Sequence, residues 1–229
     1  MTDPFQRTTL CAGVFGRDPQ MLIDTTKILH YCADQFRFKR VLLFSHDEHP
    51  LGYAGEWIQT PCIEPRENRD FLLPLIYHVI RGPVLFVHWD GFIVHPELFE
   101  PAFLEYDFIG SVWRPPETDM INNGFCWQSE KFVESFCRLP GQDPAHPEAT
   151  DKWICRKMRP LLEGQGVRFA PRELCERFSL EFDPNGRTSF GFHGKANNPQ
   201  AFELGWERVN QWLRSGKPKP AVDTSGGKA

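Results

Sequence analysis

The sequence predicts an α/β fold with a Rossmann-like, mostly parallel central sheet flanked by helices. Two observations support this fold class. An apolar strand, a helix with one apolar face and a second apolar strand follow one another within residues 8–46. Another helix and another apolar strand then follow within residues 71–87. Strand–helix–strand units of this length form right-handed crossovers between parallel strands, so the order of elements favours a parallel sheet.

The composition is ordinary for a globular protein with a sizeable core. Apolar residues make up 41% of the 229 residues and charged residues 24%. The formal net charge of −4 gives no support to a nucleic-acid partner. The seven cysteines are scattered and never spaced as C-x-x-C, which argues against a zinc site or a disulfide framework and favours a reducing compartment. Because no signal pattern and no apolar run near 18 residues is present, we expect a cytoplasmic protein without a transmembrane segment.

The first part of the chain alternates strands and helices. The stretch TTLCAGVFG, residues 8–16, is a continuous apolar run ended by an Arg-Asp-Pro turn, as expected of a buried strand. Residues 21–36 carry apolar side chains at helical spacing, and residues 40–46 form a second apolar strand. Residues 47–68 are polar and show no period, which predicts a loop.

A second crossover follows, and then shorter elements. A helix over residues 71–80, distorted in its first turn by Pro74, precedes a strand over 84–87. The remaining predicted elements are strands at 106–113, 121–127 and 167–170, and helices at 129–139 (with Ser129 as N-cap), 150–166 and 171–178. We assign residues 1–214 to one domain and residues 215–229, which carry too little apolar surface to pack, to a disordered C-terminal tail.

An acid interrupts the apolar stretch VLFVHWDGFIV, residues 84–94. A buried carboxylate is costly without a positive partner, so Asp90 is either an ion-paired structural acid or a ligand for a cation. Ligands in open α/β sheets bind at the carboxyl ends of strands, where Asp90 is predicted to lie. Gly91 beside it permits a turn or a close backbone approach. His88, two residues before Asp90, is expected on the same face of an extended strand.

Several familiar phosphate and hydrolase motifs are absent from the sequence. It contains no G-x-x-x-x-G-K-[ST], no strand-linked G-x-G-x-x-G and no G-x-S-x-G. A metal-binding acid on a Rossmann-like scaffold without a glycine-rich loop leaves nucleotide-sugar chemistry as a leading candidate.

The chain carries a series of short blocks in a fixed order. They are WDG at 89–91, YDFIG at 106–110, NNGF at 122–125, an acid near a helix start at 151, FAP at 169–171, FSLE at 178–181 and FGFHG at 190–194. This series resembles a bacterial family of mostly uncharacterised GT-A-type glycosyltransferases. The resemblance implies a GT-A-like domain. It also implies metal-assisted transfer of a sugar from a nucleoside-diphosphate sugar to a glycan or similar hydroxyl acceptor, with Mn²⁺ or Mg²⁺ as cofactor.

The resemblance further implies roles for individual residues. Asp90 resembles the acid that binds a divalent cation beside the diphosphate, and His193 the late histidine that completes such a metal site. Asp151 matches the second acid of the family's Glu-Asp block, which implies a catalytic base. The other expected contacts are to the donor through His88, Trp89, Gly91, Gly194 and Lys195, and to the acceptor through Asn122, Asn123, Gly124 and Trp127. Thr9, Val14 and Arg17 are assigned to the donor by analogy with GT-A folds alone, which usually hold the nucleotide base at the end of the first strand.

Most of these residues also have an ordinary structural interpretation, which the sequence leaves open. Asp90 has the ion-paired interpretation given above, and His193 is equally suited to a turn at a strand end. Residues 122–124 could form a plain turn, and Trp127 could be a core residue. Asp151 in the first turn of a helix stabilises the helix dipole without any catalytic role.

Three positions depart from the family pattern. His88 replaces a Gln, and we expect it to be a hydrogen-bonded residue near the site rather than a metal ligand. Gln128 replaces an Arg, which puts in doubt any acceptor contact made by that Arg. Thr150 precedes Asp151 where the family has Glu, so one acid remains where the family often has two.

Three alternative functions remain from the sequence. A sugar-nucleotide pyrophosphorylase has a similar sheet, but its glycine-rich signature is absent after residues 8–16. A nucleotide-sugar-binding protein without turnover is suggested by Gln128. A glycosyltransferase acting on modified DNA bases gains no support from the acidic balance of the chain.

Overall fold

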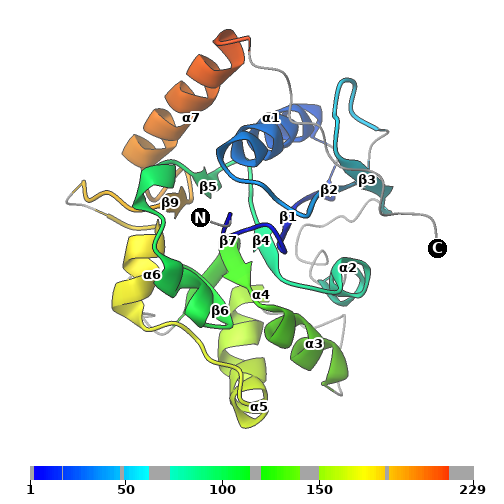
Figure 1. The fold of residues 1–229 in the computed structure, drawn as a ribbon, viewed down its shortest axis with the longest axis vertical. Helices are drawn as coiled ribbons and strands as arrows, with labels where there is room; N and C mark the ends of the chain where they lie inside the picture. Colours follow the sequence, from blue (N-terminus) through cyan, green and yellow to red (C-terminus); the bar gives the residue numbers. More distant parts are fainter. Residues whose placement is uncertain are drawn as a thin grey trace.

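The computed structural model describes residues 3–16, 18–46, 49–61, 73–113, 120–139, 150–183 and 186–216. Two sheets form its framework (Figure 1). A six-stranded sheet has the order β3-β2-β1-β4-β7-β6, and a three-stranded sheet has the order β5-β9-β8. In the larger sheet only β7 runs against its neighbours. The predicted α/β fold with a mostly parallel central sheet is therefore confirmed.

The first crossover unit is the one that the sequence predicts. Strand β1 (Thr9–Val14) pairs in parallel with β2 (Arg40–Ser45), and helix α1 (Pro19–Gln35) connects them. Helix α1 begins at Asp18, whose side chain accepts a hydrogen bond from the Met21 amide at 2.9 Å. Proline at the first helical position suits this start, because its missing N–H would have no helical partner there.

Strand β3 (Glu56–Gln59) lies in the region that the sequence predicts to be a loop. It extends the sheet in parallel beside β2. Arg40 on β2 holds Glu56 through two hydrogen bonds of 2.8 and 2.7 Å, and Trp57 donates to Ser45 at 2.8 Å. As an edge strand with partly exposed residues, β3 shows neither a continuous apolar run nor a clean alternation, so periodicity alone does not identify it.

The second crossover brings the chain to the middle of the sheet. Helix α2 (Leu73–Ile80) carries Pro74 in its first turn, as expected, and strand β4 (Val84–Phe86) pairs in parallel with β1. Residues 71 and 72, which the sequence also assigns to this helix, lie outside the described residues.

The next two strands of the central sheet form an antiparallel pair. Strand β6 (Phe108–Val112) and strand β7 (Ile121–Gln128) are antiparallel, and β7 inserts between β6 and β4. The sequence predicts both strands but not their direction. Two short 3₁₀ helices, Pro96–Leu98 and Pro101–Glu105, precede β6.

The helices that follow lie close to their predicted residues, and the predicted cap of the first of them is found. Helix α3 (Glu130–Arg138) is capped by Ser129, whose hydroxyl accepts from the Phe132 amide at 3.0 Å. The predicted strand at 167–170 is reduced to one bridge between Phe108 and Phe169. The later helical segments are α4 (Thr150–Lys152), a π-helical segment (Trp153–Met158), α5 (Arg159–Gly164) and α6 (Arg172–Phe178).

The smaller sheet and the last helix complete the structure. Strand β9 (Gly191–His193) lies between β5 (Gly91–Ile93) and β8 (Ser179–Leu180). Helix α7 (Pro199–Arg214) covers this sheet and packs beside α1. Of the expected tail, residues 215 and 216 close α7, and the rest lies outside the described residues.

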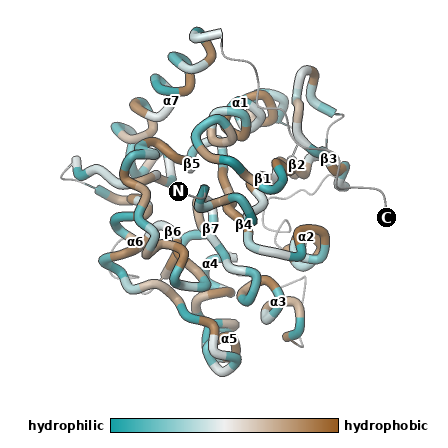
Figure 2. The backbone as a smooth tube through the Cα atoms, in the orientation of Figure 1, coloured by the Kyte–Doolittle hydropathy of each residue, from teal (hydrophilic) through white to brown (hydrophobic). Residues whose placement is uncertain are grey.

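Helix α7 has no counterpart among the predicted elements, although its signals are present. Asn198 caps it by accepting from the Ala201 amide at 3.2 Å. Hydrophobic and hydrophilic residues follow one another at intervals along the helix (Figure 2). Val209 and Trp212, three residues apart, are buried. This spacing is typical of a helix with one face on the core.

Much of the core consists of aromatic side chains that pack against one another. On the side of α2 and α3, Tyr77 packs edge-on against Phe86 and Phe136. On the side of α1 and α7, Tyr31 packs edge-on against Phe92 and Trp212. None of the helices in the described residues is long and apolar enough to cross a membrane.

Candidate functional site

Asp90 lies in a tight turn that joins the two sheets. The His88 amide donates to the Gly91 carbonyl at 2.7 Å, and the Gly91 amide donates back to the His88 carbonyl at 3.1 Å. The stretch VLFVHWDGFIV is therefore two strands of different sheets, β4 and β5, with Asp90 between them. Asp90 follows the carboxyl end of β4, as predicted. The expectation that His88 and Asp90 share a face of one extended strand is wrong, because the chain turns at these residues.

The end of β9 folds over this turn. The Gly194 amide donates to the Asp90 carbonyl at 2.8 Å, and the Lys195 amide lies 3.4 Å from the Asp90 carboxylate. Gly194 has a φ of +87°, a backbone conformation that favours glycine. A side chain at this position would strain the contact that holds Asp90.

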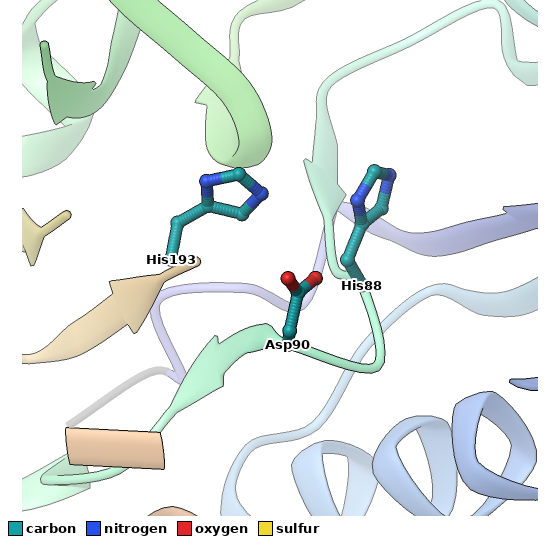
Figure 3. Close-up of side chains that lie close together, drawn as sticks. All are labelled: His88, Asp90 and His193. Carbon is teal, nitrogen blue, oxygen red and sulfur yellow. The ribbon is translucent and has the colours of Figure 1, made fainter. Parts of the chain in front are cut away.

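Three side chains converge where the turn and β9 meet (Figure 3). One ligand atom from each of His88, Asp90 and His193 lies within 4.8 Å of the others. The two imidazole rings have centroids 5.8 Å apart. Metal–nitrogen bonds of about 2.1 Å place opposite ligands about 4.2 Å apart, so small side-chain adjustments would suffice to hold a metal ion. His88, which the sequence predicts to lie near the site without binding a metal, is one of these three residues. We call the three residues the cluster.

Two glycines leave the space that the His193 ring occupies. A Cβ atom on Gly91 would come within 2.6 Å of His193 Cδ2, and one on Gly124 would overlap His193 Nε2. The sequence suggests a turn at residues 122–124, but the structure places them within strand β7. The glycine of the NNGF block thus makes room for the histidine of the FGFHG block.

Glu181 was not among the predicted site residues, yet it lies beside His193. Its Oε2 atom is 3.7 Å from His193 Nδ1, and its Oε1 atom accepts from Asn197 Nδ2 at 3.1 Å. Burial by itself would lower the pKa of His193, but the surrounding carboxylates, Glu181 foremost, outweigh burial and raise it. The signal for Glu181 in the sequence is its position at the end of the FSLE block.

Asp151 is a second buried acid beside this cluster. It is 7% exposed, in the first turn of α4, and its carboxylate accepts from the Asn123 amide at 3.1 Å. Burial raises the pKa of Asp151 to about 6, although the Asn123 hydrogen bond and the charge of His193 oppose this rise. Asn122, 7% exposed, accepts from the Gly124 amide at 2.6 Å and so stabilises the same part of β7.

Two predicted donor-binding residues lie at the edge of the Asp90 turn. The ammonium group of Lys195, an exposed residue, is 5.8 Å from the centroid of the half-buried Trp89 ring. The same group lies 5.0 Å from the ring of Phe202, against which Trp89 packs edge-on. The positive charge of Lys195 therefore lies over two aromatic rings, one of which belongs to the Asp90 turn.

The structure does not bring all of the predicted donor-binding residues to the site. Thr9 is the first residue of β1 and 2% exposed. Five residues of extended strand, about 17 Å, separate it from Val14 at the carboxyl end. Val14 ends β1 at the same edge of the sheet at which the neighbouring parallel strand β4 ends, but Val14 is only 2% exposed. Arg17 lies outside the described residues.

The predicted acceptor contact of Trp127 is likewise not supported by its position. Because β7 is antiparallel, Trp127 pairs with Leu85 and Ile109, farther from the Asp90 end of the sheet than Gly124 is. Its ring is 6% exposed and belongs to the core. Gln128 is fully buried opposite Val84, so the departure from the family's Arg concerns a core position rather than the cluster.

Two solved structures of glycosyltransferases have this fold. One is a glycosyltransferase involved in the glycosylation of the major capsid of PBCV-1, with a TM-score of 0.51 and 12% identity over 91% of this chain and 99% of that chain. The other is the apo form of the glycosyltransferase GlyE of Streptococcus pneumoniae TIGR4, with a TM-score of 0.53 and 12% identity over 93% of this chain and 65% of that chain. The chain therefore has a GT-A glycosyltransferase fold.

The sequence also matches a family model directly. The model described as "Protein of unknown function (DUF5672)" matches residues 72–193, more than half of the chain, and the chain belongs to this family. The matched region ends on His193 and includes Asp90 and Asp151. No curated protein matches the sequence.

Proposed function

We propose that this protein is a metal-dependent glycosyltransferase that moves a sugar from a nucleoside-diphosphate sugar to a glycan or other hydroxyl acceptor. The observation that carries the proposal is the group of His88, Asp90 and His193 at the carboxyl end of β4, within a GT-A fold. Ligands of open α/β sheets bind at this end of the strands.

The side chains of this group fit a divalent cation. Two imidazoles and one carboxylate form a mixed nitrogen and oxygen set, which suits Mn²⁺ better than Mg²⁺, a cation that prefers oxygen ligands. A cation held there would neutralise the charge that develops on the leaving diphosphate. In this proposal Asp90 is kept in place for that role by the backbone amides of Gly194 and Lys195.

The residues around Asp90 support binding of the donor. The ammonium group of Lys195 is exposed and free to reach a phosphate as a point charge. Gly194 allows the backbone to approach the diphosphate closely, whereas the open side of Gly91 is filled by the His193 ring. Trp89, half-buried beside Lys195, offers an aromatic face at the same edge.

Asp151 is our proposed base for the acceptor hydroxyl. A group whose pKa lies near the working pH is well matched to proton transfer, and burial brings the pKa of Asp151 to about 6. Its hydrogen bond from the Asn123 amide fixes one carboxylate oxygen, Oδ1. Asn122, Asn123 and Gly124 then line the acceptor side of the cluster.

The test is donor hydrolysis by the full-length protein with a panel of nucleoside-diphosphate sugars and Mn²⁺. We expect slow hydrolysis of one donor, its loss in excess chelator, and its loss in Asp90→Ala. The Asp90 variant should stay folded, because removal of a partly buried charge also removes its desolvation cost. Asp24→Ala, which removes a surface carboxylate of α1, is the matched control. Full activity in excess chelator would contradict metal dependence.

The alternative of a nucleotide-sugar-binding protein without turnover loses its main support. That alternative depended on Gln128, which is a buried core residue in β7. In the panel experiment, such a protein would bind a donor in the presence of Mn²⁺ and hydrolyse none.

A further inference from the structure

Glu181 is a largely buried carboxylate whose two oxygens face one side-chain amide and one imidazole. Its side chain is 12% exposed. Oε1 accepts from Asn197 Nδ2 at 3.1 Å. Oε2 and the facing His193 Nδ1 are both buried, and neither has a hydrogen-bond partner within the described parts of the chain. Since a buried charge is costly unless it is paired, the facing imidazole is the partner that this carboxylate requires.

The two oxygens of Glu181 are not equivalent, and this fixes its orientation. The amide of Asn197 can donate to Oε1, which leaves Oε2 to face the ring. Asn197 belongs to the turn that follows His193, and its backbone amide donates to the Gly194 carbonyl at 3.1 Å. Because the Gly194 amide in turn holds the Asp90 carbonyl, Glu181 stabilises the segment that carries both His193 and the contacts to Asp90.

The chemistry of a carboxylate determines which nitrogen of the ring carries the proton. An ionised carboxylate only accepts hydrogen bonds, so Glu181, 3.7 Å from Nδ1, favours the tautomer in which Nδ1 carries the proton. In the neutral ring, Nε2 then keeps its lone pair. Figure 3 shows a ring nitrogen of His193 directed towards His88, on the side away from its own strand. With Nδ1 facing Glu181, this nitrogen is Nε2, the atom that a Cβ on Gly124 would overlap.

We propose that Glu181 is a positioning residue, which holds His193 in the tautomer that directs the Nε2 lone pair towards the cation site formed with His88 and Asp90. This inference rests on the proposed metal site. A carboxylate behind a metal-binding histidine both orients the ring and increases its basicity, and loss of such a partner lowers metal affinity about 10- to 100-fold.

The tautomer can be measured without any metal or substrate. Full-length protein with ¹⁵N-labelled histidine would be examined by NMR at alkaline pH, where the imidazole is neutral, and the His193 signals identified by their loss in His193→Gln. We expect Nδ1–H in the wild type. In Glu181→Gln and Glu181→Ala the fixed acceptor is lost, so the Nε2–H form should gain population. Glu203→Gln, on the exposed surface of α7, is the control and should match the wild type.

Mn²⁺ titration of the same proteins by calorimetry then separates the two hypotheses. We expect an affinity about 10- to 100-fold lower in both Glu181 variants, with thermal melting to confirm that they are folded. Wild-type binding with unchanged affinity and unchanged tautomer in both variants would overturn the positioning role. Absence of Mn²⁺ binding in the wild type would instead overturn the proposed metal site on which this inference rests.

Discussion

At the level of single residues, Asp151 unites burial, a fixed hydrogen bond and proximity to the cluster. A base needs its carboxylate ionised, so the transfer rate should rise with pH through about 6, the pKa to which burial raises Asp151. We predict that Asp151→Asn keeps Mn²⁺ and donor binding but loses at least about a hundredfold in transfer rate, together with this pH dependence. Steady-state rates between pH 5 and 8 measure both effects. A variant with near-normal turnover would remove Asp151 from the mechanism.

The candidate acids and the candidate histidine that the sequence singles out are those with the strongest local signals. Asp90 interrupts an apolar strand, and His193 lies between two glycines, so each is visible in its own neighbourhood. Glu181 has no such signal, because it becomes part of the site only when β8 and β9 pair. The depth of Trp127 depends on the antiparallel pairing of β7, which its own sequence does not show. Thr9 is a different case, because it lies at the amino-terminal start of the strand predicted at residues 8–16 and so far from the carboxyl end.

At the level of elements, β7 controls the space available to the His193 ring. We predict that Gly124→Ala displaces this ring, because the added methyl group would overlap Nε2. Mn²⁺ affinity measured by calorimetry should fall, while the fold is kept by the rest of the strand. The matched control is Gly164→Ala in α5, where an added methyl group meets nothing within 4 Å. In that helix alanine should be neutral or slightly stabilising. Equal affinities in the two variants would contradict this account of β7.

Helices with a periodic apolar face can be predicted from the sequence. Features that depend on pairing with an adjacent strand cannot. Helices α1 and α3 have an apolar face and a capping side chain, Asp18 or Ser129, that sequence rules identify. Strand β3 has no such pattern, because it is an edge strand held partly by Arg40 and Ser45 of the adjacent strand. The antiparallel direction of β7 is a property of the assembled sheet, which no local pattern contains.

At the level of the whole molecule, the protonation of Asp151 changes the free energy of unfolding. Its folded-state pKa of about 6 lies above the ordinary 3.8, so the folded protein binds this proton more tightly than the unfolded chain does. This contribution to stability is present below pH 3.8 and is lost as pH rises through about 6. Two pKa units correspond to about 3 kcal/mol, more than the helix-dipole stabilisation of at most about 1 kcal/mol that an aspartate supplies in a first helical turn.

We therefore predict that Asp151→Asn unfolds at higher urea concentration than the wild type at pH 7. The two should converge at about pH 4, where the wild-type carboxyl is protonated. Urea titrations in chelator at four pH values between 4 and 7 measure this difference, with Asp24→Asn as the surface control. A variant less stable than the wild type at pH 7 would mean that the charged carboxylate is stabilised by its surroundings.

The position of Asp90 between two sheets has a consequence for how the molecule opens locally. Asp90 follows a strand of the central sheet, whereas His193 ends the middle strand of the small sheet. An ion shared by both would tie local opening of the small sheet to the central sheet. We predict that Mn²⁺ slows amide hydrogen exchange in β8, β9 and the start of α7, and leaves β1 and β2 unchanged. Asp90→Ala should abolish this protection, and protection spread evenly over both sheets would contradict it. The small sheet, rather than the large one, would then be the part of the protein whose order reports whether the ion is bound.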